Sequence, residues 1–200
     1  MKSLLLLAIL LVATMGADSA DLPPPTPKNP VALIGDSITH QGDWIKVLGR
    51  TDVTNWGIPG YTTGQLAWTF KDLLRQQPGV KVVFLGGGIN DLTLGVPPER
   101  IFENQVKAVA YWREHGVVPV LQSVIYKTDD PETNAIIKAL NARLQVWCVS
   151  ARVDYLDLNV VLAGHDALRA DLSTDGTHLK PEAYPLWAKL VTAELAKLHL

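Results

Sequence analysis

The chain lacks the features that mark several large classes of protein. It has one cysteine, Cys148, and therefore cannot form an internal disulfide. Its 18 basic and 20 acidic residues give a formal net charge of −2, which argues against binding to nucleic acid or to an anionic membrane surface. No grouping of histidine, cysteine and acidic residues has the spacing of a metal site. We therefore expect no metal and no other cofactor.

The first 30 residues differ in composition from the rest. A positively charged start precedes an apolar run that is too short to span a bilayer, and small residues follow. This pattern predicts a signal peptide over residues 1–20, and thus an exported protein, periplasmic or secreted, without stable membrane insertion after cleavage. A retained membrane anchor is the alternative. Residues 21–30 hold five prolines and predict an extended linker. Residues 31–200 suffice for one domain.

Along that domain, short apolar runs alternate with segments whose apolar residues recur at helical spacing. The runs predict five buried strands, at residues 31–34, 53–56, 80–85, 117–124 and 153–158. Apolar stripes at helical spacing predict helices between the strands and at the C-terminus, and Cys148 belongs to one such stripe as a small buried residue. This alternation predicts a parallel sheet covered on both faces, with ligands bound beyond the carboxyl ends of the strands.

A serine follows the first predicted strand directly, in the segment Gly35-Asp36-Ser37. The glycine allows a sharp turn, and we expect the serine at the start of a helix. The N–H groups at a helix start can hold a developing negative charge, as the reaction of a serine nucleophile requires. Taken alone, the segment fits a helix N-cap better than a nucleophile, because serine is a favoured capping residue.

Three further segments carry groups that such a reaction needs. Gly57, after the second predicted strand, can bring a backbone N–H close to a substrate. Asn90 follows a glycine run that lacks both the P-loop lysine and the dinucleotide-binding spacing, and its amide can point into the same crevice. Asp175 lies three residues before His178, where a carboxylate can orient an imidazole as a base. Each segment alone also fits a plain turn or loop contact.

Together, the four segments resemble the sequence blocks of the SGNH hydrolases, also called GDSL-type esterases and lipases. The matching blocks are Gly35-Asp36-Ser37, Asn55-x-Gly57-x-x-Gly60, Gly88-x-Asn90-Asp91 and Asp175-x-x-His178. Their order and approximate spacing agree over the whole of residues 31–200. The resemblance implies a flavodoxin-like, three-layer α/β/α sandwich with a five-stranded parallel sheet.

The resemblance also implies a role for each matching residue. Ser37 would be the nucleophile and His178 the general base, with Asp175 orienting the imidazole. The oxyanion donors would be the backbone N–H groups of Ser37 and Gly57 and the side-chain amide of Asn90. These roles describe a carboxylic ester hydrolase that acts through an acyl-enzyme.

The substrate is less clearly indicated than the reaction. No insertion is long enough to form a lid, which favours an open, shallow site for short acyl groups. Trp44 and Trp56 can pack on a sugar, although burial in the core is the simpler explanation for both. We expect a small-molecule or glycan ester as substrate, with a glycan O-acetyl ester as one candidate. The alternatives are a lysophospholipase or arylesterase with longer acyl preference, and a non-catalytic glycan-binding module.

Overall fold

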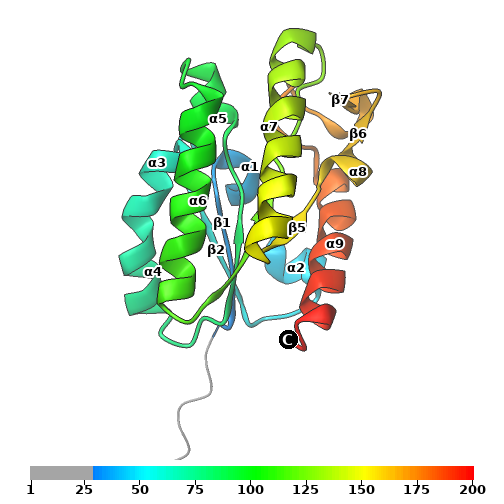
Figure 1. The fold of residues 1–200 in the computed structure, drawn as a ribbon. Coiled ribbons are helices and arrows are strands. Elements are labelled where there is room, and N and C mark those ends of the chain that lie inside the picture. The colour runs from blue at the N-terminus through cyan, green and yellow to red at the C-terminus, as the bar shows by residue number, and fades with distance from the viewer. Residues whose placement is uncertain (1–28) are drawn as a thin grey trace, which may run out of the picture.

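The computed structural model describes residues 29–200, so the predicted signal peptide and most of the predicted linker lie outside the described residues. The described chain forms a five-stranded parallel sheet between two layers of helices (Figure 1), which confirms the predicted fold class. The sheet order is β2-β1-β3-β4-β5. The strands are β1 (Val31–Gly35), β2 (Val53–Gly57), β3 (Val82–Leu85), β4 (Val118–Gln122) and β5 (Asp154–Leu156).

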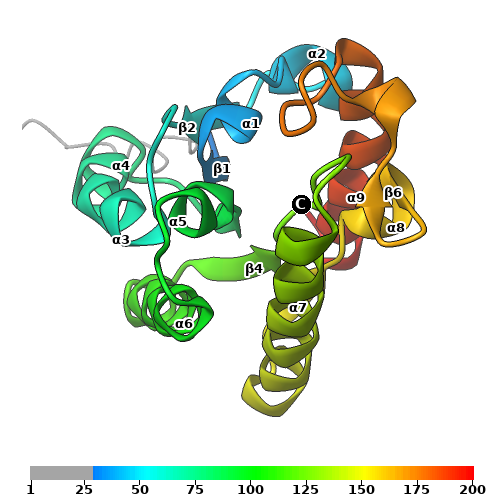
Figure 2. The same ribbon diagram turned by 90° about the horizontal axis from the view of Figure 1, so that it is seen from above.

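Two layers of helices cover the sheet, as the view from above shows (Figure 2). One layer contains α3 (Thr63–Leu66), the 3-10 turn η1 (Ala67–Thr69), α4 (Phe70–Gln76), α6 (Pro98–Glu114) and α7 (Pro131–Ala151). The other contains α2 (Trp44–Leu48) and α9 (Tyr184–Lys197), which pack on each other. Helices α6 and α7 begin with proline, which suits a first helical position because the missing N–H would have no partner there. None of the described helices is long and apolar enough to cross a membrane.

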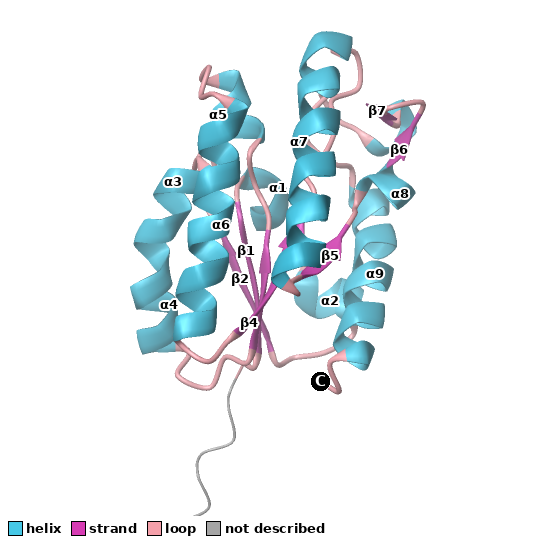
Figure 3. Cartoon of the chain, in the orientation of Figure 1, coloured by secondary structure: helices cyan, strands magenta, loops and turns pink. Residues whose placement is uncertain are grey.

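Short elements gather around the carboxyl ends of the strands (Figure 3). They are α1 (Ser37–His40), α5 (Ile89–Thr93), α8 (Asn159–Leu162), the hairpin β6 (Ala163–Gly164) and β7 (Ala167–Leu168), and the 3-10 turns η2 (Ala170–Leu172) and η3 (Pro181–Ala183). Because all five strands of the sheet are parallel, the loops after β1, β2 and β3 emerge at one edge.

Strand β1, an interior strand of the sheet, is completely buried, since it is covered on both faces. Its pairing places Gly35 opposite Gly57 of β2 and Ile34 opposite Leu85 of β3. The segment that begins with Asp36 therefore starts level with the ends of both neighbouring strands.

Three predicted strands, the third, fourth and fifth, are longer in the sequence pattern than in the structure. The fourth was expected to reach Val124, but β4 ends at Gln122. The N–H of Ser123 still donates to the carbonyl of Leu156 in β5 at 3.0 Å, but both backbone groups of Val124 pair with side chains instead of a strand. The N–H of Val124 donates to Asn141 Oδ1 at 2.9 Å, and its carbonyl accepts from Asn141 and Asn159. An apolar run does not reveal such a change of partner.

The structure settles the position of three residues discussed from the sequence. Cys148 is fully buried in α7, as predicted. Trp44 is also buried and donates its Nε1–H to the carbonyl of Thr39, so the core explanation is confirmed for this residue. Trp56 is only partly buried and packs against the core.

Candidate active site

The nucleophile candidate Ser37 is the first residue of α1. Asp36 caps this helix, and its Oδ1 accepts the N–H of Ile38 at 2.9 Å. Gly35 precedes the turn, where a Cβ atom would lie 2.1 Å from Thr39 Oγ1. Only glycine therefore allows α1 to start so close to the strand, which explains the Gly-Asp-Ser order physically.

Three side chains form a hydrogen-bonded chain across the site. Ser37 Oγ lies 3.0 Å from His178 Nε2, although the two residues are 141 positions apart. His178 Nδ1 lies 2.7 Å from Asp175 Oδ2. A proton on Nδ1 donates to the carboxylate, and this tautomer leaves Nε2 free to accept the proton of the serine hydroxyl.

Asp175 is held as a carboxylate although it is exposed. Its Oδ1 accepts the backbone N–H of His178 at 2.8 Å and that of Thr177 at 3.0 Å. The backbone hydrogen bond from His178, followed by the His178 side chain and the Thr177 backbone, lowers the pKa of Asp175 to about 2. The Asp175 side chain is therefore charged at any ordinary pH.

Asn90 lies in α5, at the end of the neighbouring strand β3. Its Nδ2 donates to the carbonyl oxygen of Tyr61 at 3.0 Å, which leaves one amide hydrogen for another acceptor. The next residue, Asp91, is buried and accepts the N–H and hydroxyl of Thr63 at 2.8 and 2.6 Å. Burial raises the pKa of Asp91. These bonds attach the segment that contains Asn90 to Thr63, the first residue of α3.

The backbone N–H of Gly57 already has a partner. It donates to Asn55 Oδ1 at 2.9 Å, while Asn55 Nδ2 donates to the carbonyls of Thr39 and His40. A Cβ at Gly57 would lie 2.2 Å from the backbone nitrogen of His40, so this glycine is needed for the packing of α1 against β2. Sequence reasoning assigned no role to Asn55, although its place in the matched block is the signal that singles it out.

Gly60, in the same matched block, has a different environment. It is exposed, with φ +79°, and a Cβ there would meet no atom within 4 Å. Within residues 29–200, its N–H makes no hydrogen bond. The N–H of Gly57, the last residue of β2, is therefore paired, whereas in the loop that follows the Gly60 N–H is unpaired among the described residues.

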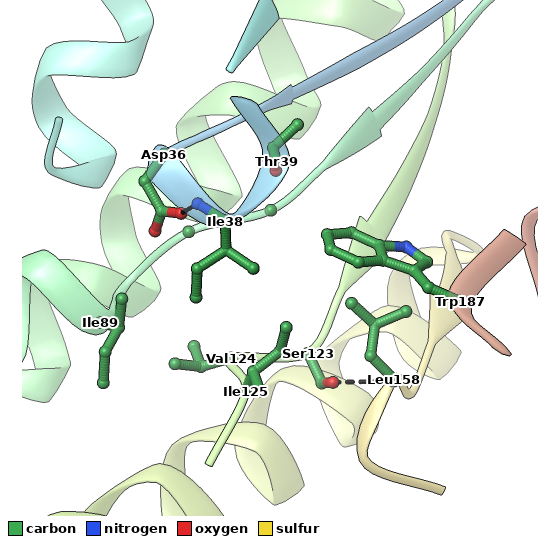
Figure 4. Close-up of a pocket in the computed structure, with 11 residues that line it drawn as sticks. Asp36, Ile38, Thr39, Ile89, Ser123, Val124, Ile125, Leu158 and Trp187 are labelled. Atoms are coloured by element: carbon green, nitrogen blue, oxygen red, sulfur yellow. Dashed lines mark hydrogen bonds between the residues drawn. The ribbon is translucent and has the colours of Figure 1, made fainter. Parts of the chain in front are cut away.

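A small cavity lies behind α1, lined by Asp36, Ile38, Ser123 and Trp187 among others (Figure 4). Its volume is about 20 Å³, which is room for one water molecule and not for a substrate. Asp36 is 3% exposed, and burial raises its pKa to about 6 against the hydrogen bond from Ile38 and the nearby His178. Ser37 and His178, in contrast, are only partly buried, so both side chains are partly accessible from the molecular surface.

The structure thus brings together Ser37, His178 and Asp175 by direct contacts, with Asn90 on the next strand end. Among the residues that the structure describes, no group of three or more histidine, cysteine or acidic side chains is arranged to hold a metal ion.

Comparison with known proteins finds relatives in sequence and in structure. An N-acylneuraminate cytidylyltransferase of Streptococcus agalactiae is 31% identical over 147 residues, which are 70% of this chain and 36% of that protein. The lipoprotein YqeF of Bacillus subtilis is 31% identical over 148 residues, 62% of this chain and 58% of that protein. This chain therefore spans about a third of the first relative and somewhat more than half of the second.

The structural match covers more of both chains. A GDSL-like lipase from Bacteroides thetaiotaomicron superposes with a TM-score of 0.76 at 20% identity, over 88% of this chain and 91% of that one. That likeness shows a common fold. Residues 33–186 match the model of the GDSL-like lipase/acylhydrolase family. Because this match includes all but the ends of the described chain, it confirms the predicted resemblance: the protein belongs to the GDSL-like lipase/acylhydrolase family.

Proposed function

We propose that the protein is a serine esterase that hydrolyses carboxylic esters through an acyl-enzyme on Ser37. The observation that carries the proposal is the continuous chain from Ser37 Oγ through His178 to the ionised Asp175. A binding module has no use for a serine, a base and an orienting carboxylate at these distances.

The reaction follows from this geometry in two steps. Ser37 Oγ attacks the ester carbonyl as His178 Nε2 takes the hydroxyl proton, and the resulting imidazolium stands beside the Asp175 carboxylate. The tetrahedral intermediate collapses, and the alcohol leaves with the proton from His178. Water then attacks the acyl-enzyme, losing its proton to His178, which returns a proton to Ser37 as the carboxylic acid departs.

Three donors hold the negative charge of the intermediate in this proposal. They are the N–H of Ser37, the free amide hydrogen of Asn90 and one backbone N–H from the loop after β2. Gly60 suits the third position better than Gly57, because the Gly57 N–H is bound to Asn55 and the Gly60 N–H has no partner among the described residues. An open backbone at Gly60 also lets the substrate approach closely.

For the substrate, we propose a short acyl ester, with O-acetyl groups on a glycan as the best candidate. Trp68 is 70% exposed, and its ring packs edge-on against Tyr61 with 6.3 Å between centroids. Tyr61 is the residue whose carbonyl binds Asn90, so an exposed aromatic surface begins beside the oxyanion site. Tryptophan faces pack well on sugar rings. The Streptococcus agalactiae relative is named for an N-acylneuraminate, an acylated sugar acid.

The proposed cellular location is outside the cytoplasm. The charged and apolar start of the sequence supports it, as does the Bacillus subtilis relative, which is named a lipoprotein.

The nucleophile is tested with Ser37→Ala and p-nitrophenyl acetate. We expect the variant to lose activity and to resist labelling by a fluorophosphonate probe, while Ser150→Ala, which removes a serine hydroxyl on α7, keeps both. An active Ser37→Ala enzyme would contradict the mechanism. Failure of the folded parent to label would favour the non-catalytic glycan-binding alternative.

The substrate class is tested with p-nitrophenyl esters from C2 to C16 and an acetylated oligosaccharide. We expect the highest kcat/KM at C2, and we expect Trp68→Ala to raise KM for the oligosaccharide but not for p-nitrophenyl acetate. Val149→Ala, which also trims an exposed apolar side chain, is the control. A maximum at C8 or longer would favour the lysophospholipase or arylesterase alternative.

A further inference from the structure

Helix α1 is too short to hold Ser37 in place by itself. It has four residues, and its ends are closed by the bonds from His40 N–H to Asp36 O at 2.9 Å and from Gln41 N–H to Ser37 O at 3.0 Å. An isolated helix of one turn is unstable in water because its nucleation is costly. The position of the nucleophile therefore depends on contacts from other elements.

Two side chains bind the carbonyl groups near the C-terminal end of α1. The carbonyl of Thr39 accepts from Trp44 Nε1 at 2.9 Å, from Asn55 Nδ2 at 3.2 Å and from the N–H of Gly42. Asn55 Nδ2 also reaches the carbonyl of His40 at 3.0 Å. If one of these donors is removed, the Thr39 carbonyl still accepts hydrogen bonds from the other two.

The carbonyl of Ile38, in contrast, depends on Tyr184. The Tyr184 hydroxyl donates to it at 2.9 Å, in a buried bond that joins α1 to the first residue of α9. Within residues 29–200, this carbonyl has no other hydrogen-bond donor. Burial raises the pKa of Tyr184, and the nearby Asp36 raises it further, so the hydroxyl remains a donor over any assay range.

Tyr184 is also firmly connected to the catalytic histidine, which lies six residues earlier. The connection is compact: Leu179 and Ala183 are buried, and the N–H of Lys180 donates to Leu172 O at 2.8 Å. The Tyr184 ring packs edge-on against Trp44, with 5.8 Å between centroids. The hydrogen bond from Tyr184 to Ile38 therefore joins the segment that contains Ser37 to the segment that contains His178.

We infer that Tyr184 is a positioning residue of the active site, whose hydroxyl holds α1 against the His178 segment and so sets the Ser37–His178 contact. This inference rests on the proposed function, because it concerns the alignment of that nucleophile and base. Tyr184 acts through Ile38, which follows Ser37 directly, and need not touch the substrate. Its removal therefore acts on the chemical step and not on substrate binding.

The test is Tyr184→Phe, which keeps the ring and removes only the donor. Misplacing reacting groups by about 1 Å can cost about 10²-fold in rate, and loss of one bond with the ring retained displaces them less. We expect kcat for p-nitrophenyl acetate to fall about tenfold, with KM changed less than twofold. The rate constant for labelling of Ser37 by a fluorophosphonate should fall by the same factor, since it reports the nucleophile alone.

A matched control separates positioning from lost stability. Thr69→Val removes another buried hydroxyl, which donates to the carbonyl of Leu66 at 2.7 Å in the opposite helix layer. We expect both variants to lower the melting temperature, but only Tyr184→Phe to lower kcat and the labelling rate.

Two results would overturn the inference: unchanged kcat in Tyr184→Phe, or an equal loss of kcat in Thr69→Val. These are distinguishable from failure of the proposed function, which shows itself as retained activity in Ser37→Ala.

Discussion

Asn90 Nδ2 donates to the carbonyl oxygen of Tyr61 at 3.0 Å, and this bond joins the loop after β3 to the loop after β2. It uses one of the two amide hydrogens and orients the other. The adjacent bonds between Asp91 and Thr63 hold the same two loops together. A donor that is fixed before the substrate arrives needs no reorganisation when charge develops, which is the condition for effective oxyanion stabilisation.

Replacement of Asn90 tests this arrangement. Loss of one oxyanion donor typically lowers turnover by about 10²–10³, so we expect Asn90→Ala to lower kcat by this factor with little change in KM. Steady-state kinetics on p-nitrophenyl acetate measure the effect. Asn104→Ala is the control, because the Asn104 side chain binds Thr63 Oγ1 at 3.0 Å in the neighbouring network. An equal loss in the control would assign the effect to the network and not to the donor.

Asp175→Asn tests the orienting carboxylate. The amide can still accept the backbone N–H groups of Thr177 and His178, but its Nδ2 would face His178 Nδ1 and favour the wrong tautomer. We expect kcat to fall by about 10⁴, as in comparable triads, and the melting temperature to change little because Asp175 is exposed. Kinetics and thermal unfolding measure both. A loss of kcat below tenfold would show that the orientation of His178 does not need this charge.

Asp36 should make stability depend on pH. Its pKa is raised by burial from 3.8 to about 6, so the folded state retains this proton at pH values where the unfolded state has lost it. The stability contributed by the protonated form is fully present below pH 3.8 and is lost as the pH rises through about 6. The difference between these pKa values corresponds to about 3 kcal/mol.

Asp36→Asn mimics the protonated form and keeps an acceptor for the Ile38 N–H. We expect urea unfolding to show that the free energy of unfolding of the variant, relative to that of the parent, rises by up to about 3 kcal/mol as the pH is raised from 3.5 to 7.5. A stability difference that stays constant over this range would mean that Asp36 ionises as readily in the folded state as in the unfolded state.

Cys148 should be unreactive in the native protein. It is fully buried in α7, and burial raises its pKa to about 12, so the thiolate is scarce at any assay pH. A thiol reagent such as dithiobisnitrobenzoate should label no cysteine in the native chain and one in the unfolded chain. Stoichiometric labelling of the folded protein at pH 8 would contradict the prediction.

Much of the fold could be predicted because apolar runs report burial directly. The strand from Val31 is apolar at every position, as a strand covered on both faces must be. The end of β4 could not be predicted, since Val124 is as apolar as a strand residue but binds the side chain of Asn141. The core position expected of Trp44 is confirmed, but the exposure of Trp68 could not be predicted, because tryptophan occurs in cores and at binding surfaces alike.

The sequence by itself determined the α/β architecture, the family and the residue types of the candidate site, since these depend on local pattern and on short motifs. Only the tertiary structure decided which groups meet. It placed Ser37 Oγ 3.0 Å from His178 Nε2, paired the Gly57 N–H with Asn55 and joined Ile38 to Tyr184. It also left the Gly60 N–H without a partner in the described part of the chain. Such hydrogen bonds link residues far apart in the chain, and their geometry is fixed by the packing of whole strands and helices, which no short stretch of sequence contains.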